Sequence, residues 1–155
     1  MDKKDLKKLI QQLFDHQRFA VIATEMNRQP YTNLIAFAST SDLRILVFAT
    51  KRDTQKYLNV NENNHIAILI DNRENTPSDL SKAITVTALG TAREAQDQNV
   101  EYRNLLLKKH PDLSVFLSNP SCALMEIHVT TYQIIQKFEQ VQILQIGDVE
   151  KSSTL

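Results

Sequence analysis

Three short apolar runs, each ending at a polar turn, constrain the fold of this chain more than any other feature. The runs cover residues 19–24, 31–38 and 43–49 and are rich in residues that favour strands. The segments between them, residues 27–30 and 39–42, contain the Asn, Pro, Ser and Asp typical of tight turns. Because connections this short join antiparallel neighbours, the sequence predicts a meander near the N-terminus.

Later runs extend the predicted sheet. Strands are expected at residues 66–70, 83–94, 123–129 and 140–146, with extended chain over 130–138. The run 66–70 is apolar on both faces, which indicates a central strand. Gly90, one of two glycines in the chain, indicates a bulge or the close approach of another backbone. Since closure removes exposed sheet edges, we expect a mainly β fold: an antiparallel barrel of six to seven strands with flanking helices.

Helices are expected between and around these strands. Apolar residues at helical spacing predict the first helix over residues 3–16. The others are predicted over 53–61, 96–109 and 113–117, the second of them capped by Asp53 or Thr54. Residues 71–82, charged and without periodicity, are expected to form a mobile loop. We expect residues 1–155 to form a single domain, with a frayed tail from residue 148.

Composition excludes several classes of protein. The 155 residues contain 18 basic and 18 acidic side chains, so there is no basic excess for coating nucleic acid. The only cysteine, Cys122, cannot form an intrachain disulfide and reads as a small buried hydrophobe rather than a nucleophile. The four histidines share no helical face, so no metal site is expected. With no apolar run long enough for a bilayer, we expect a soluble cytoplasmic protein.

The most chemically suggestive stretch is residues 48–58, where a strand runs through a polar turn into a helix. Thr50, Lys51, Thr54 and Lys56 place two hydroxyls and two ammonium groups near a predicted helix N-terminus. Such a terminus presents free backbone N–H groups and a favourable dipole, which suit a phosphate. Alone, the stretch is also compatible with an ordinary capped helix.

In its setting this stretch resembles the pyridoxamine 5′-phosphate oxidase-like flavoproteins. The order of helix and strands, the pattern Phe-Ala-Thr-Lys-x-x-Thr-x-Lys at residues 48–56 and the apolar strand after it carry the resemblance, over residues 1 to about 130. The resemblance implies an FMN-binding split β-barrel and a homodimer with flavin sites at the interface.

The resemblance also implies site residues. Thr50, Lys51, Gln55 and Lys56 would contact the phosphate and ribityl chain, with Lys56 the most important and Thr54 in place of the family's Ser. The backbone of residues 33–36 would run along the isoalloxazine ring. The implied cofactor-binding residues are therefore Asn33, Leu34, Ile35, Ala36, Thr50, Lys51, Thr54, Gln55 and Lys56.

Departures from the family pattern bear on activity. Asn33 stands near the family's strand Arg, the following Lys has no counterpart, and the C-terminal Trp-Arg-Leu-type ending is missing. Oxidation of pyridoxamine phosphate is therefore not expected. Three hypotheses remain: an FMN-dependent oxidoreductase, a non-enzymatic module holding flavin, haem or a deazaflavin, and a dimeric interaction protein that has lost its ligand. The residues indicate no catalytic side chain, substrate or electron donor.

Overall fold

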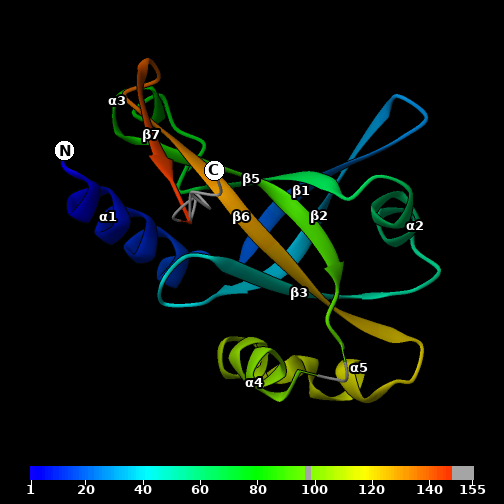
Figure 1. Cartoon of the computed structure of the whole chain (residues 1–155). Helices are drawn as coiled ribbons and strands as arrows, with labels where there is room; N and C mark the ends of the chain where they lie inside the picture. The colour runs from blue at the N-terminus through cyan, green and yellow to red at the C-terminus, as the bar shows by residue number, and fades with distance from the viewer. Residues whose placement is uncertain (97–98, 148–155) are drawn as a thin grey trace, which may run out of the picture.

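The computed structural model, which describes residues 1–96 and 99–147, is built around one antiparallel sheet (Figure 1). The order is β3-β2-β1-β4-β5-β6-β7, and β3 also pairs with β6, so that six strands close into a barrel and β7 lies outside the closure. This confirms the predicted fold. The strands are β1 Phe19–Met26, β2 Gln29–Ser39, β3 Ile45–Lys51, β4 His65–Asp71, β5 Ile84–Glu94, β6 Cys122–Gln136 and β7 Gln140–Gln145.

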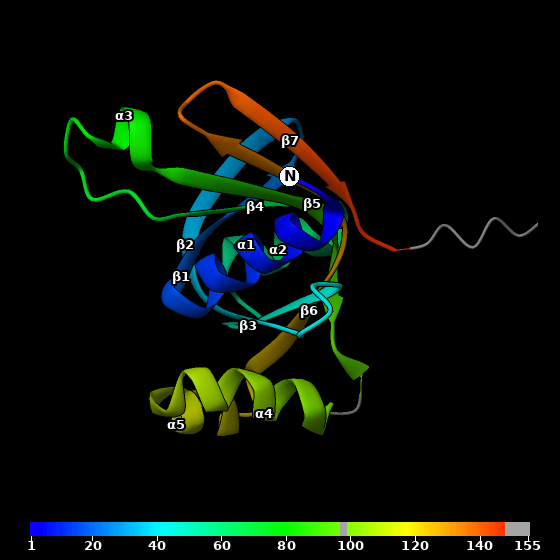
Figure 2. The same ribbon diagram turned by 90° about the vertical axis from the view of Figure 1, so that its left-hand side faces the viewer.

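Helices cover the two barrel ends and part of the outer wall. In two perpendicular views, α1 and α2 lie at opposite barrel ends, and α4 and α5 lie beside β3 and β6 (Figures 1 and 2). No helix of the described residues combines the length and apolar character needed to cross a membrane. The helices are α1 Lys3–His16, α2 Gln55–Glu62, α3 Asp79–Lys82, α4 Val100–Lys109, the 3₁₀ helix η2 Pro111–Leu113 and α5 Ser114–Ser118.

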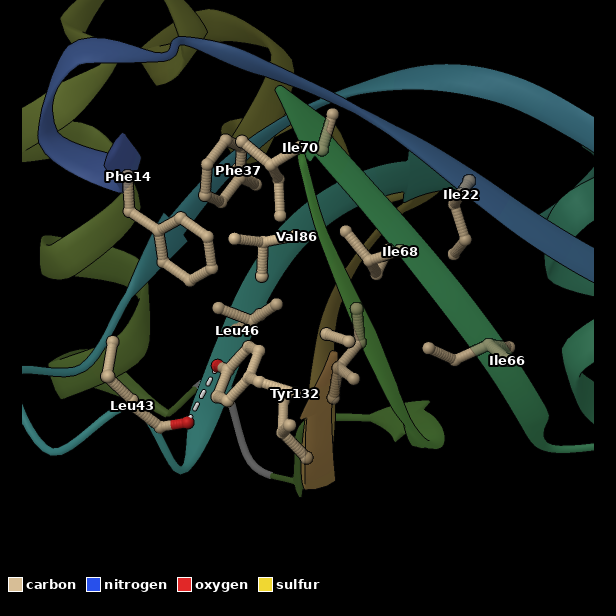
Figure 3. Close-up of a cluster of buried hydrophobic side chains, with 14 of the residues drawn as sticks. Phe14, Ile22, Phe37, Leu43, Leu46, Ile66, Ile68, Ile70, Val86 and Tyr132 are labelled. Atoms are coloured by element: carbon tan, nitrogen blue, oxygen red, sulfur yellow. Dashed lines mark hydrogen bonds between the residues drawn. The ribbon is translucent and has the colours of Figure 1, made fainter. Parts of the chain in front are cut away.

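The barrel core is aromatic at one end and aliphatic along its length (Figure 3). The ring of Phe14 packs edge-on against Phe37 and Tyr132, with centroids 5.4 and 5.8 Å apart. Such pairs stabilise a core beyond the apolar area they bury. Phe14 comes from the apolar stripe predicted for the first helix, so α1 joins the barrel core.

A second, smaller core lies outside the barrel wall. Alternate residues of β3, Ile45 and Val47, point away from the barrel interior and pack with Leu106 of α4 and Leu117 of α5. Because successive side chains of a strand point to opposite faces, Leu46 and Phe48 face the interior. Both faces of β3 are therefore buried.

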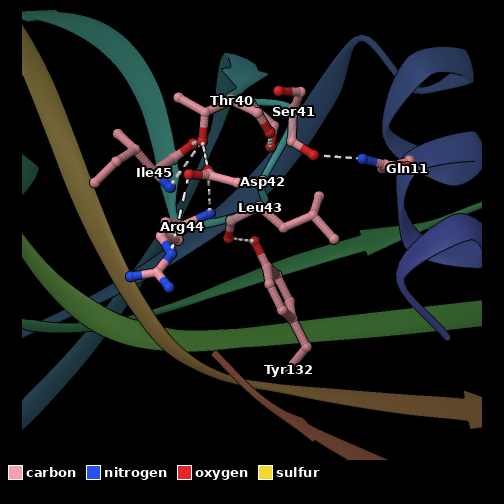
Figure 4. Close-up of polar contacts among 9 residues, drawn as sticks. Gln11, Thr40, Ser41, Asp42, Leu43, Arg44, Ile45 and Tyr132 are labelled. Atoms are coloured by element: carbon pink, nitrogen blue, oxygen red, sulfur yellow. Dashed lines mark hydrogen bonds and ion pairs between the residues drawn. The ribbon is translucent and has the colours of Figure 1, made fainter. Parts of the chain in front are cut away.

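The turn between β2 and β3 is held from inside the barrel (Figure 4). The buried Tyr132 hydroxyl donates to the Leu43 carbonyl at 2.8 Å, and the backbone of Leu43 has a positive φ of 63°. Asp42 accepts hydrogen bonds from the Thr40 hydroxyl at 2.7 Å and from the Arg44 N–H at 3.0 Å. Chiefly through the Thr40 bond, these contacts lower the pKa of the Asp42 carboxyl. The turn is thus fixed by both its own side chains and a distant strand.

Some boundaries differ from the sequence predictions. The strand predicted at 123–129 and the extended chain after it form one continuous strand, β6. Residues 79–82 of the predicted loop are helical as α3. The Asp79 carboxylate holds the turn before this helix by accepting the N–H groups of Glu74 and Asn75 at 3.0 and 2.8 Å. The helix predicted over residues 96–109 begins only at Val100, as α4. Residues 97–98 and the predicted tail, 148–155, lie outside the described residues.

Gly90 confirms both expectations attached to it. The β5–β6 register shifts between Leu89 and Gly90, which marks a bulge. A Cβ added to Gly90 would overlap the carbonyl oxygen of His128 on the neighbouring strand. Only a residue without a side chain fits this approach of the two backbones.

We therefore predict that Gly90→Ala destabilises the protein by about 1–3 kcal/mol, the range typical of overpacking. The free energy of unfolding from urea titration measures this. Thr91→Ala, which only removes atoms from the next position, is the control. Equal stability of Gly90→Ala and the parent protein would show that the two strands can separate without cost.

Removing the Tyr132 hydroxyl tests the anchored turn. Tyr132→Phe leaves the Leu43 carbonyl without its buried donor, which costs about 1–3 kcal/mol. Tyr31→Phe, at a position that is 40% exposed, serves as the matched control with little expected effect. Thermal and urea unfolding of the two variants should separate them, and identical curves would contradict the anchoring role.

Candidate functional site

The barrel wall opens where β2 and β3 part. Their ladder consists of the pairs Phe37–Phe48, Ala38–Val47 and Ser39–Leu46 and goes no further. Beyond it, β3 stays paired with β6 as far as Lys51, and β2 stays paired with β1 back to Gln29. The facing edges, residues 29–36 of β2 and 49–51 of β3, have no strand partner on that side among the described residues. We call this opening the split.

The implied cofactor-binding residues form two groups, residues 33–36 and residues 50–56, and both lie at the split. Ile35 and Thr50 each lie two residues beyond the last β2–β3 pair, on the two lips. Asn33 to Ala36 continue along one lip, and Lys51 leads from the other through a short turn to Gln55, the first residue of α2. Residues separated by about twenty positions therefore border one opening, as a shared ligand would require.

The two threonine hydroxyls hold the turn into α2. Thr54 is the N-cap, and its Oγ1 accepts the Tyr57 N–H at 3.4 Å. The Thr50 and Thr54 hydroxyl oxygens lie 2.7 Å apart, and each is within 3.1 Å of the Lys51 carbonyl oxygen. Thr50 is buried. The two hydroxyls thus hold the start of α2, so an ordinary capped helix explains this part of residues 48–58.

Lys56 is different, because the protein does not satisfy its charge. Its side chain is half-buried, and burial lowers the pKa of its ammonium group. Within residues 1–96 and 99–147 it forms neither an ion pair nor a hydrogen bond. Removing a charge from water without a partner is unfavourable. An anion beside the start of α2 would therefore be bound by both the ammonium and the helix terminus.

Gln55 fastens α2 to the barrel. Its side-chain amide donates to Asn59 Oδ1 at 2.7 Å, and Asn59 donates to the Thr24 hydroxyl at 3.0 Å. Asn59 and Thr24 are both buried. Gln55 and Lys51 are themselves exposed, so both side chains border the solvent side of the opening.

The opposite lip contains an unsatisfied acceptor. Asn33 Oδ1 is buried and has no hydrogen-bond donor in the described structure, although its amide nitrogen donates to the Leu34 carbonyl at 3.3 Å. Buried polar atoms are nearly always hydrogen-bonded, so such an atom indicates a missing donor. Leu34 beside it is 69% exposed, Ile35 is buried and Ala36 is half-buried.

A network that the sequence analysis missed fixes the turn itself. The Arg52 guanidinium binds Glu94, with Nε at 3.1 Å from Oε1, and also donates to the Pro120 carbonyl at 2.8 Å. The Tyr57 hydroxyl donates to the other Glu94 oxygen at 2.8 Å. The Arg52 bond, followed by the Tyr57 bond, lowers the pKa of Glu94. Arg52 lies inside the stretch singled out above, but nothing local indicates its distant partner.

Two large cavities lie outside the split. One, of about 760 Å³, lies between α4 and β6. The other, of about 670 Å³, is lined by Arg52, Arg103 and Cys122 among others. Burial raises the pKa of the Cys122 thiol, which agrees with its interpretation as a hydrophobe. None of the nine predicted residues lines either cavity, and no group of three or more His, Cys, Asp or Glu gathers among the described residues.

Comparison with known proteins identifies the family of this chain. The model for pyridoxamine 5′-phosphate oxidase matches residues 6–136. No curated protein sequence matches the chain.

Solved structures agree on the fold. General Stress Protein 26 from Bacillus anthracis superposes with a TM-score of 0.70 at 19% identity, over 91% of this chain and 98% of that protein. A heme binding protein from Mycobacterium smegmatis gives 0.79 at 12% identity, and ChuZ from Campylobacter jejuni gives 0.78 at 12%. Each of these matches covers 94% of this chain but only 58% and 61% of those longer proteins. At such identities the similarity shows a shared fold.

Proposed function

The chain belongs to the pyridoxamine 5′-phosphate oxidase family, and on this premise we propose that it binds FMN in the split and acts as a flavin-dependent oxidoreductase. The observation that carries the proposal is the pairing of two unsatisfied groups at one opening. Among the described residues, Lys56 is a half-buried cation without a counter-ion, and Asn33 Oδ1 is a buried acceptor without a donor.

These two groups match the two ends of FMN. A phosphate at the start of α2 would receive charge-assisted hydrogen bonds from Lys56 and from the free N–H groups of the helix terminus. The polar edge of a flavin ring carries an N–H, which Asn33 Oδ1 would accept. The backbone edge of residues 33–36 that faces away from β1 offers further donors and acceptors to the same edge of the ring. The two unsatisfied groups therefore suit a molecule that is anionic at one end and polar at the other.

The protein's part in the chemistry would be to bind and orient the cofactor. When bound, FMN supplies the transfer of electrons between a donor and a substrate. The Arg52–Glu94–Tyr57 network fixes the turn that presents Lys56, and the Gln55–Asn59–Thr24 chain fixes α2 against β1.

We further propose that two copies pair through the bare outer face of the sheet. One cross-strand row runs from Leu34 through Val21, Leu69, Thr87 and Gln133 to Ile143. This row contains no charged side chain. Leu34 and Ile143 at its ends are 69% and 58% exposed. A contiguous uncharged face of this kind is typical of a protein interface.

The same face would connect dimerisation to the cofactor. Leu34 belongs both to the row and to the lip of the split, next to Asn33. A second copy packed on Leu34 would therefore cover the opening and exclude water from a bound flavin. A dimer of this kind would explain why the proposed ligand site is uncovered in a single chain.

A haem-binding module is the alternative, favoured by the structural similarity to a heme binding protein. Three histidine rings are already hydrogen-bonded, those of His16, His110 and His128. His65 at the start of β4 is exposed, and its ring forms no hydrogen bond within the described residues. His65 is therefore the first candidate for a haem ligand among the described histidines, because both of its ring nitrogens are free. The cation and the acceptor at the split suit a flavin or deazaflavin better.

The phosphate contact is tested by comparing FMN with riboflavin, which has the same ring without the phosphate. We predict that Lys56→Gln weakens FMN binding by about 1.5–3 kcal/mol, the value of a charged hydrogen bond. Riboflavin binding should not change. Fluorescence quenching on titration measures both affinities.

Lys3→Gln, on the exposed surface of α1, is the matched control and should bind FMN as the parent does. A protein that takes up no FMN, or a Soret band on haem addition that is lost in His65→Ala, would overturn the flavin proposal. Unchanged FMN affinity in Lys56→Gln would mean that the phosphate lies elsewhere.

The dimer is tested by placing a charge on the bare face. Leu34→Lys should convert a dimer to a monomer in sedimentation velocity, because burying an unpaired ammonium is unfavourable. FMN affinity should fall in parallel. Val115→Lys, at an 83% exposed apolar position on α5, is the matched control. A parent protein that is monomeric at all concentrations would contradict this arrangement.

A further inference from the structure

One carboxylate, that of Glu94, is bonded to both ends of a short segment of the chain. Its Oε1 accepts from the Arg52 guanidinium, with Nε at 3.1 Å, and its Oε2 accepts from the Tyr57 hydroxyl at 2.8 Å. Residues 52–57 run from the turn after β3 into the first turn of α2. The side chain of Glu94 therefore closes this segment into a loop. We call the three side chains the Glu94 clamp.

The segment inside the Glu94 clamp is the one that would meet a phosphate. The N–H groups of Gln55 and Lys56, at the first two positions of α2, have no partner within the helix. A phosphate bound at this end of α2 would meet these N–H groups and the Lys56 ammonium together. Whether the three groups converge on one point therefore depends on what holds residues 52–57.

The Glu94 clamp is anchored in the barrel wall. Glu94 is the last residue of β5 and lies opposite Met125 of β6. The N–H of the next residue, Ala95, donates to the Leu124 carbonyl at 2.8 Å, so the backbone on both sides of the carboxylate is held by β6. The clamp thus fixes the start of α2 relative to the sheet.

The sign of the charge on Glu94 distinguishes positioning from simple electrostatics. The bond from Arg52, followed by the bond from Tyr57, lowers the pKa of the Glu94 carboxyl, so the group stays ionised. A negative charge near a bound phosphate is by itself unfavourable, and its removal would tighten FMN binding. If Glu94 instead holds the segment in place, its removal would weaken FMN binding. The two roles therefore predict opposite effects.

We propose that Glu94 is a positioning residue that makes the split prefer a phosphorylated flavin, without touching the flavin itself. The proposal rests on the FMN site proposed above. The Glu94 clamp orders Lys56 and the neighbouring N–H groups before the phosphate arrives, so less conformational freedom is lost on binding. The ring end of the site, at Asn33 on β2, has no part in the clamp. Glu94 therefore acts on the phosphate end alone.

The test measures FMN and riboflavin affinities of the full chain by fluorescence quenching. Glu94→Gln should weaken FMN binding about three- to tenfold, a part of what a hydrogen bond to a charged group contributes, and leave riboflavin binding unchanged. Asp53→Asn removes an exposed acid from the same turn and should bind FMN at least as tightly as the parent. Glu62→Gln, at the other end of α2, is the matched control and should bind FMN as the parent does.

A double-mutant cycle shows whether Glu94 acts through Lys56. In the Lys56→Gln background, Glu94→Gln should reduce FMN affinity less than it does in the parent, because the ammonium that it positions is gone. Tyr57→Phe breaks only one of the two bonds to the carboxylate and should cause a smaller loss of FMN affinity. It tests the proposal even if Glu94→Gln does not fold.

The outcomes separate this proposal from the FMN proposal. A parent protein that takes up no FMN would overturn both. Where the parent binds FMN, three results would each overturn the positioning role alone: unchanged or tighter FMN binding in Glu94→Gln, an equal loss of riboflavin binding, or an equal effect in the Lys56→Gln background.

Discussion

The pairing of β3 with β6 is the constraint on which the rest of the structure depends. It joins residues 45–51 to residues 122–128, more than seventy positions later, and closes the barrel. Because β3 follows β6 as far as Lys51, it leaves β2 after Phe48 and opens the split. The same pairing presents the outward side chains of both strands to α4 and α5. Closure, the split and the outer helical layer therefore have one origin.

Much of the fold could be predicted because its signals are local. Strand runs, turn residues and the stripe of the first helix depend on neighbours within a few positions, and the barrel followed from their number. Thr54 as N-cap was one of two residues named in advance. The strand at 123–129 and the extended chain predicted after it are one strand, β6, although the side-chain alternation changes near Thr130. The turn that leads into α3 is held by one carboxylate, Asp79, that no periodicity reveals.

The candidate site was predictable in its residues but not in its energetics. The sequence shows a lysine at position 56, whereas the half-burial of its side chain depends on how α2 packs. Likewise, no local pattern indicates that Asn33 Oδ1 is buried without a donor among the described residues. The partners Arg52 and Glu94 are 42 residues apart, and the lining of the cavity between α4 and β6 comes from four separate segments. Such contacts are properties of the closed barrel and have no sequence signature.

Gly90 stands at a close approach of the β5 and β6 backbones. The missing side chain lets β5 come near the carbonyl oxygen of His128, whose ring lines the cavity between α4 and β6. The register of the two strands shifts at the same point. A side chain at position 90 would therefore change the spacing of the two strands and, through His128, the wall of that cavity.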